Sequence, residues 1–374
     1  MSNPTFSDFL KTTDQKVITP TTEILNEAVR QTYMYSSMLR GKRAGQILQG
    51  GSSLTDRVQF EDNGSFMFYT SGQELNPTTK QTLRTVTFNW RFSKADYSWN
   101  DEEVDLNEGD YKVQYKELKL SYEQGAYTSM VNGMEDALWA VPNADVMEDN
   151  DGSDAYSIPA FFDELGSTFH WPGFTNIGGL DPGIETRWRN QTQRYDPLQL
   201  DDEDEGLLTA FDRMWLKVKF DAPDTASRYF EDDNLNAMKI VTNLNGHTMY
   251  KARLRAGNDR FISPQDPAYN APTYQGVPLK YIEALNDALL DQNALANSSV
   301  SQAWQDGEPR FMFINCKYLY PIFHSKRFMS KKGPIDGGVN MPFSHAVYFR
   351  SYYNLFCRSR QRQGIISPFA PANS

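Results

Sequence analysis

The feature that most constrains the fold is the stretch 109–141, in which apolar side chains recur every three or four positions. This spacing is typical of a helix that buries one face, and Pro142 ends the pattern because proline cannot continue a helix. A helix of about 30 residues would span about 45 Å, whereas globular helices average about 11–12 residues. We therefore expect one unusually long helix with these residues near one face: Tyr111, Tyr115, Leu118, Tyr122, Ala126, Met130, Met134 and Leu138.

Ahead of this helix, residues 54–105 change to a period of two. In the stretch RTVTFNWRF every second side chain from Val86 to Phe92 is apolar, the pattern of a half-buried strand. The stretch DRVQFEDNGSFMFYTSG holds two more such runs on either side of Asn63 and Gly64, a pair that favours a tight hairpin turn. We expect a long β-hairpin or small sheet here.

The other segments combine helix and strand signals. Residues 1–53 hold a helix-like piece, TEILNEAVRQTYMYSSMLR, and end in a glycine-containing stretch, which predicts a mobile arm. Two later segments are expected to form shorter helices, EGLLTAFDRMWLKVKFDAP and VPLKYIEALNDALLDQ. RFMFINCKYLYPIF and SHAVYFRSYYNLFCRSRQRQGIISPF have the composition of strands, and the glycine-rich KKGPIDGGVNMP is expected to join them. The sequence thus predicts an α+β protein.

The net charge of −11 is unevenly distributed along the chain. Residues 308–374 carry ten Lys and Arg against two acidic residues, residues 1–50 carry six against four, and residues 51–307 are strongly acidic. Such opposed segments can attract one another, within one chain or between copies. An isoelectric point near 5.0 argues against sequence-specific nucleic-acid recognition, which usually relies on a basic domain.

We expect the protein to stay in a cytoplasm. No apolar run approaches the 18–20 residues or so that a membrane span needs, and the N-terminal residues lack the basic start and apolar core of a signal peptide. Cys316 and Cys357 lie in apolar, strand-like surroundings without CxxC spacing, so we expect buried free thiols.

No catalytic, cofactor or metal site emerges from motifs. The four histidines are scattered, MEDNDGSDAYSI lacks carboxylates at the first and last positions of a calcium loop, and no GxSxG elbow is present. The acidic run Asp201–Glu205 could bind a divalent ion or supply catalytic carboxylates, although such runs are usually solvated.

The segment NIGGLDPGIETRWRNQ, residues 176–191, does not fit a phosphate-binding loop either. Its glycines and Pro182 allow a tight path, while Trp188 between Arg187 and Arg189 would supply contact area and forked hydrogen bonding. Trp and Arg are typical interface anchors, which favours contact with another protein. The alternative is burial of Trp188 within its own subunit.

Three stretches, together with the order of the expected elements, resemble the major capsid protein of tailed bacteriophages, the Hong Kong 97-like fold. FNWRFSKADYSWNDEEVDLNEGD is similar to the family's hairpin returning to its long spine helix, with Trp90 in the aromatic strand and Asn107 at the start of the helix. NIGGLDPGIETRWRNQ is similar to its glycine-rich segment. NLFCRSRQRQGIISPF is similar to its closing strand, with a basic-then-glycine ending: Arg358, Arg360, Arg362 and Gly364.

The resemblance implies a domain organisation. Residues 1–53 would form an N-terminal arm, and residues 54–106 an extended β-hairpin, the E-loop. The peripheral domain would combine residues 107–142, the spine helix, with the β-sheet of residues 313–374. Residues 143–312 would form the axial domain.

The resemblance also implies a structural protein and not an enzyme, with no cofactor and no metal. Copies would assemble into hexamers and pentamers of an icosahedral shell around double-stranded DNA, made in the host bacterial cytoplasm and found in the virion. The sequence shows no obvious coiled-coil region ahead of the arm, so we expect scaffolding and portal proteins to be separate; binding of a decoration protein is left open. Inter-subunit contacts are expected at these residues: Trp90, Arg91, Trp188, Arg187, Arg189, Arg358, Arg360 and Arg362.

Two other functions are compatible with the sequence. One is an encapsulin-like nanocompartment shell of the same fold. The other is a metal-dependent hydrolase that uses the Asp/Glu cluster. Some relatives of the capsid family crosslink a hairpin lysine to a neighbouring asparagine, and Lys80 lies in the corresponding region, although nothing near it in sequence marks it as reactive.

Overall fold

The computed structural model describes most of the chain from residue 46 onward, in these ranges: 46–48, 50–61, 64–72, 80, 82–102, 112–140, 142–143, 147, 153–163, 174–198, 205–219, 237–257, 272–286, 309–336 and 343–368. Several predictions lie outside these residues, namely the helix-like segment of the arm, Asn107, Tyr111 and most of the acidic run at 201–205.

The chain divides into two compact units. The helix unit combines Met1–Thr32, Ser93–Met134 and Lys326–Ser351. The sheet unit combines Tyr33–Phe92, Glu135–Ser325 and Tyr352–Ser374. The architecture mixes helix and sheet, as the sequence predicts.

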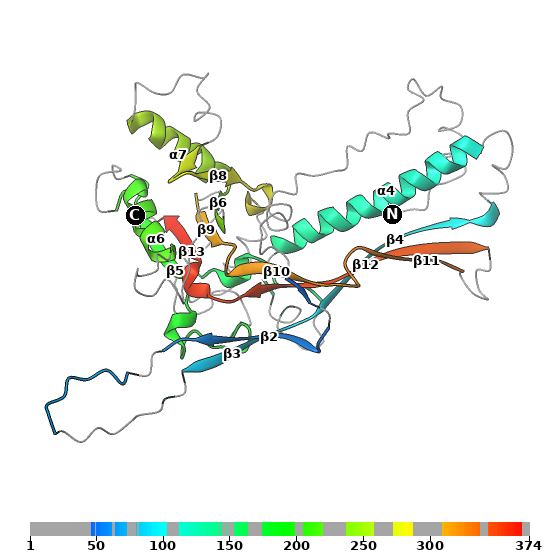
Figure 1. Ribbon diagram of the computed structural model, residues 1–374. Helices are drawn as coiled ribbons and strands as arrows, with labels where there is room; N and C mark the ends of the chain where they lie inside the picture. Colours follow the sequence, from blue (N-terminus) through cyan, green and yellow to red (C-terminus); the bar gives the residue numbers. More distant parts are fainter. Residues whose placement is uncertain are drawn as a thin grey trace. The chain divides into compact units, whose positions relative to one another are not determined.

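The long helix is the main element of the helix unit. It runs over Lys112–Leu138 as α4 and is about 40 Å long at 1.5 Å per residue, which confirms the prediction. Of the expected face, Ala126, Met130, Met134 and Leu138 are buried. In Figure 1, α4 lies along the strands of this unit: β4 (Arg91–Asn100), β11 (Ser330–Asp336) and β12 (Ser344–Cys357).

Apolar packing and polar contacts join α4 to these strands. A small core forms from Tyr97 of β4, Ala126 of α4, and Val347 and Phe349 of β12. Lys331 of β11 donates a 2.6 Å hydrogen bond to Glu123 of α4, which raises the pKa of Lys331. At the ends of the strands, the two ring nitrogens of His345 lie 2.8 Å from the carboxylates of Asp101 and Asp336.

The expected loop KKGPIDGGVNMP proves to be partly a strand. Its first six residues belong to β11, which pairs antiparallel with β12 from Ser330–Arg350 to Asp336–His345. The prediction was wrong because Gly333 and Pro334 lie where the register shifts, between Lys332 and Ile335. At such a bulge a proline need not donate to the ladder, so it does not end the strand.

The sheet unit is built on six strands in the order β5-β13-β9-β6-β8-β7. Helix α6 (Leu207–Val218) lies in one of the two segments expected to form shorter helices and packs on this sheet, and α7 (Leu244–Gly257) follows β6. Glycine at position 364 lets β13 approach α6 closely, because a Cβ there would lie 2.2 Å from Met214 Sδ and 2.8 Å from Val218 Cγ2. The strands are β5 (Gln191–Tyr195), β6 (Met238–Thr242), β7 (Thr273–Tyr274), β8 (Val277–Tyr281), β9 (Phe311–Asn315) and β13 (Gly364–Pro368).

The segment VPLKYIEALNDALLDQ begins as a strand, so the expected helix was wrong there. Val277–Tyr281 is β8, followed by a single 3-10 turn at Glu283–Asn286. Val277 and Leu279 are buried, with a period of two, and β8 pairs in parallel with β6 and antiparallel with β7. Pairing with the edge of β6 thus makes this segment a strand and not a helix.

Further strands of the sheet unit form a ladder and a ribbon. β10 (Leu319–His324) pairs with β12 and with β1 (Gln46–Leu48). β2 (Ser53–Gln59) and β3 (Leu83–Asn89) form an antiparallel ribbon. Short 3-10 turns occur at Pro159–Phe161, Thr186–Trp188 and Arg360–Arg362.

Two predictions for the hairpin region were wrong: the pairing partner of β2 and the alternation of buried residues through Phe92. β2 pairs with β3 and not with the run after Gly64, which is not a strand. Phe66–Tyr69 are apolar at successive positions, so no single face of that run could be buried, whereas Val86 and Phe88 share one buried face. The alternation was also expected to continue through Phe92. It reverses at Trp90, between β3 and β4, so that Arg91 is buried and Phe92 is exposed.

Two buried tyrosines make the sheet unit sensitive to alkaline pH. Burial raises the pKa of Tyr250 and of Tyr353 to about 12, helped by the carboxylates of Asp212 and Asp154, respectively. An unfolded chain loses these protons near pH 10, so the stability they give is complete below that pH and disappears as the pH rises towards 12. We expect the free energy of unfolding in urea to fall over this range and Tyr353→Phe to reduce the fall. An identical fall in the variant would contradict this.

Candidate functional site

The glycine-rich segment around Gly178 packs closely against β3 of the β2–β3 ribbon. The amide of Thr87 in β3 donates a 3.0 Å hydrogen bond to the carbonyl of Gly178. Gly178 has a φ of +64°, and a Cβ there would lie 2.7 Å from Val86 and 2.9 Å from Phe88. Only glycine permits both this backbone conformation and this close approach. The segment is therefore shaped to fit the ribbon.

The buried side chain of Trp188 holds this glycine-rich segment against the ribbon. Its side chain has 0% exposure, its indole N–H donates a 3.0 Å hydrogen bond to the carbonyl of Ile177, and its ring lies 5.9 Å from that of Phe60, just after β2. Of the two alternatives that the sequence leaves open, the structure shows burial within the subunit. The indole has no surface left for a neighbour.

The arginines beside Trp188 differ in their surroundings. Arg189 folds back over its own loop, donating hydrogen bonds to the carbonyls of Pro182 at 2.7 Å and Gly183 at 3.3 Å. Arg187 is exposed. A 2.6 Å ion pair between Arg84 and Glu185 also ties this loop to β3.

The other four predicted arginines differ in burial and in their partners. Arg358, which is exposed, forms a 2.8 Å ion pair with Asp56 of β2, and Arg362 is half-buried. Arg91 and Arg360 are buried: Arg91 donates to the carbonyl of Met147 at 2.6 Å, and Arg360 to that of Phe161 at 3.1 Å. Burial lowers the pKa of Arg360 to about 10.

The burial of Arg91 and Arg360 directs their guanidinium groups to internal carbonyls and leaves almost no surface for an inter-subunit contact. For the more accessible arginines, contact with a neighbouring subunit stays a prediction. Lys80 forms an ion pair with Glu61 at the base of the loop between β2 and β3, and this contact lowers the pKa of Glu61.

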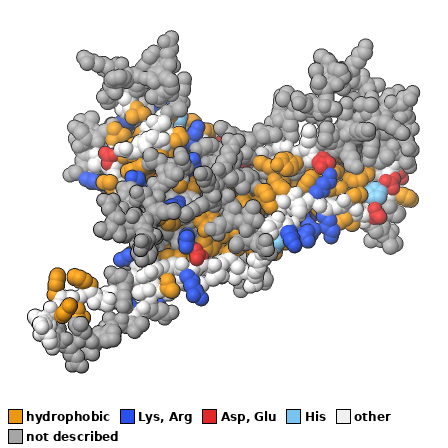
Figure 2. All heavy atoms as spheres, viewed as in Figure 1, with side chains coloured by type: hydrophobic (Ala, Val, Ile, Leu, Met, Phe, Trp, Pro, Cys, Tyr) orange, Lys and Arg blue, Asp and Glu red, His pale blue; other side chains and the backbone are white. Residues whose placement is uncertain are grey.

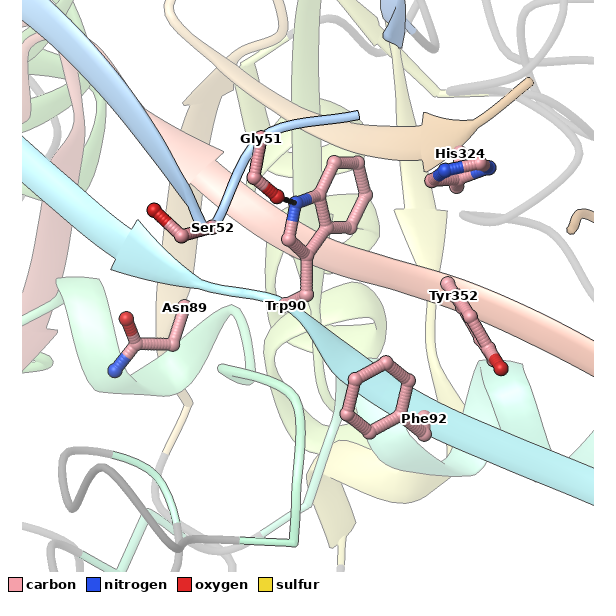
Figure 3. A pocket seen from close by; sticks show the side chains of 7 residues that line it. All are labelled: Gly51, Ser52, Asn89, Trp90, Phe92, His324 and Tyr352. Carbon is pink, nitrogen blue, oxygen red and sulfur yellow. Dashed lines mark hydrogen bonds between the residues drawn. The ribbon is translucent and has the colours of Figure 1, made fainter. Parts of the chain in front are cut away.

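Trp90, the last predicted contact residue, lines an open pocket at the other end of the ribbon (Figure 3). Its indole N–H donates a 3.1 Å hydrogen bond to the carbonyl of Gly51. The pocket has a volume of about 490 Å³. It is lined by Gly51, Ser52, Asn89, Trp90, Phe92, His324 and Tyr352.

The aromatic rings of this pocket meet edge to face. The ring centroids of Phe92 and Tyr352 lie 4.5 Å apart, and those of Trp90 and His324 lie 5.7 Å apart. His324 and Tyr352 are far apart in sequence but come together because β10 pairs with β12. Sequence reasoning missed this pocket, since only strand pairing assembles it.

An exposed apolar tip lies on the loop beyond the ribbon and comprises Phe66–Tyr69. Phe66 and Phe68 are 84% and 91% exposed, and their rings pack edge to face with centroids 5.3 Å apart. Figure 2 shows apolar atoms gathered on this loop. Exposed clusters of large apolar side chains usually mark interaction sites.

Within the described ranges, no group of three or more His, Cys, Asp or Glu side chains is placed to hold a metal ion. No helix in that part of the chain is long and apolar enough to cross a membrane. Cys316 and Cys357 are free thiols; Cys357 is fully buried, and burial raises its pKa to about 12.

Comparison with known proteins identifies the fold. No protein-family model and no curated protein matches the sequence. The chain is similar to a chain of the cyanophage A-1(L) capsid asymmetric unit, with 12% identity and a TM-score of 0.57 over 93% of this chain and 95% of that one. It is also similar to a chain of the capsid of a native GTA particle, with 12% identity and a TM-score of 0.52 over 95% and 96% of the two chains. The protein therefore shares its fold with capsid chains.

Proposed function

We propose that this chain is a structural protein, the major capsid protein of a tailed phage. Copies would assemble as hexamers and pentamers into an icosahedral shell that encloses double-stranded DNA. The observation that carries this proposal is a fold shared with capsid chains over nearly the whole length of both partners. The three stretches that resemble the Hong Kong 97-like family support the same assignment.

In this proposal the parts of the subunit take the roles expected from the family. The helix α4 is the spine helix of a peripheral domain that comprises residues 107–142 and 313–374. Its C-terminal strand β13 extends into the six-stranded sheet, where it pairs with β5 of the axial segment. Residues 54–106, with the β2–β3 ribbon and its loop, are the E-loop. Residues 143–312 form the axial domain, and residues 1–53 the N-terminal arm. An exposed apolar tip on the loop supports its role as a contact element.

The proposed partners follow from the same assignment. Separate scaffolding and portal proteins would direct closure of the shell, and the packaged DNA would be held by non-specific contact. The accessible arginines Arg187, Arg189, Arg358 and Arg362 are proposed to lie at or near subunit contacts. Forked guanidinium groups suit such contacts because they can bind carboxylates of a neighbour in a bidentate manner.

Electron microscopy of the purified protein tests the proposal. The chain is expressed alone and together with the proteins encoded beside it, and both preparations are examined by negative staining. We expect uniform shells, or tubes or sheets built from hexamers, in at least the second preparation. Monomers alone in both preparations would overturn the proposal. Particles that hold an enzyme instead of DNA would favour a nanocompartment.

A further inference from the structure

The two aromatic surfaces of the sheet unit lie at opposite ends of one ribbon. The pocket includes Gly51, Ser52, Asn89 and Trp90, which flank the first pair of the ladder, Ser53 with Asn89. The ladder ends at Gln59 with Leu83, about 20 Å away at about 3.4 Å per residue. Beyond that end the loop that carries Phe66–Tyr69 continues away from the ribbon (Figure 1). The tip of a subunit therefore points away from the pocket of the same subunit.

The tip presents exposed aromatic rings that a binding partner could cover. Burial of an exposed phenylalanine side chain is favourable, so the exposed rings of Phe66 and Phe68 favour any contact that covers them. Because the two rings already pack edge to face, they can enter a site as one unit.

The pocket is suited to bind such rings because its own lining is largely aromatic. Phe92, at its rim, is 66% exposed, while Trp90 and Tyr352 are partly buried in the walls. Phe92 packs edge to face with Tyr352, and Trp90 packs edge to face with His324, around the open pocket shown in Figure 3. Such rings can make further edge-to-face contacts with an aromatic ligand. The walls are held in place, because Trp90 bonds to Gly51 and the side-chain amide of Asn354 donates a 2.7 Å hydrogen bond to the carbonyl of Asn89.

We propose that Phe66 and Phe68 of one copy insert into the pocket formed by Trp90, Phe92, His324 and Tyr352 of a neighbouring copy. This inference rests on the proposed function, which brings many copies together. The partner is a second copy because each chain supplies both complementary surfaces in equal number, at ends of the ribbon that cannot satisfy each other within one subunit. Aromatic anchors filling a pocket are typical energetic centres of interfaces.

The contact is head to tail, since tip and pocket are different surfaces. Contacts of this kind form closed rings when the rotation between neighbours closes. Each subunit in a hexamer or pentamer would then donate one tip and accept another. A two-fold symmetric dimer would require tip to meet tip or two reciprocal insertions, and the opposite placement of the two surfaces favours the ring.

Disulfide trapping in assembled particles tests the contact. A double variant, Phe68→Cys with Phe92→Cys, is compared with each single variant after mild oxidation and denaturing electrophoresis. We expect a ladder of covalent oligomers from the double variant and no more than the wild-type background from either single one. The native Cys357 contributes little to that background because it is buried. Particles that assemble normally without a ladder would overturn the inference while leaving the proposed function intact.

A second set of variants measures what the contact contributes. The variant with Phe66→Ser and Phe68→Ser is expected to lower the yield of particles on the order of tenfold or more, because it removes the anchor. The control, Leu198→Ser with Leu216→Ser, removes two equally exposed apolar side chains elsewhere in the sheet unit and should assemble normally. Equal yields from the two variants would also overturn the inference. Failure of the wild-type chain to assemble would instead count against the proposed function.

Discussion

Replacing Phe211 with alanine is expected to lower the free energy of unfolding by about 3–5 kcal/mol. Phe211 lies on α6 with no exposed surface, and its ring packs edge to face on Phe311 and Phe313 of β9, with centroids 4.9 and 5.2 Å away. It also stacks on Tyr250 of α7 at 5.2 Å. The substitution leaves a cavity where helix and sheet meet, and domains are typically stable by only about 5–15 kcal/mol. Urea unfolding followed by tryptophan fluorescence measures the loss.

The same helix supplies the control for Phe211→Ala. Leu216 lies five residues later on α6 and is 79% exposed, so Leu216→Ala should change the free energy of unfolding by no more than about 0.5 kcal/mol. Both substitutions introduce alanine into one helix, which keeps the change in helix propensity small. Equal losses in the two variants would show that the contacts of Phe211 do not hold α6 on the sheet.

Elements with a long repeated pattern could be predicted from the sequence. In α4, apolar or tyrosine side chains recur three or four residues apart from Tyr115 to Leu138, and in α6 apolar side chains do so over three turns, which favours a helix in both segments. The strand Val277–Tyr281 could not be predicted in this way, because a short apolar segment fits both periods. Its parallel pairing with β6, for example Ile240 with Leu279, is a contact distant in sequence and decides the outcome.

The candidate site was only partly predictable for a related reason. The sequence indicates that the segment around Trp188 is special, but composition cannot distinguish an indole that contacts a neighbour from one that is buried. The deciding partners are the ring of Phe60 and the carbonyl of Ile177, which the fold brings to it. The pocket left no local signal, since His324 and Tyr352 lie on different strands.

Replacing Trp188 with alanine is the second large effect that we expect, again about 3–5 kcal/mol of stability. Besides the cavity, the carbonyl of Ile177 loses its donor, which costs about 1–3 kcal/mol if it stays buried without a partner. Because Trp188 also packs against Phe60, the loss should be greatest at the base of the ribbon. Hydrogen exchange at the amide of Thr87, which bonds to Gly178, measures that local loss.

Arg187 provides a control for Trp188→Ala within the same turn. It is exposed, so Arg187→Ala should leave both the unfolding midpoint and the exchange rate of the Thr87 amide nearly unchanged. If Trp188 instead served mainly as an inter-subunit anchor, Trp188→Ala would impair assembly but leave the isolated subunit as stable as wild type. The buried indole, its hydrogen bond and its contact with Phe60 lead us to expect the opposite. Loss of particles would then follow from a loosened ribbon, because the ribbon carries both the tip and the pocket.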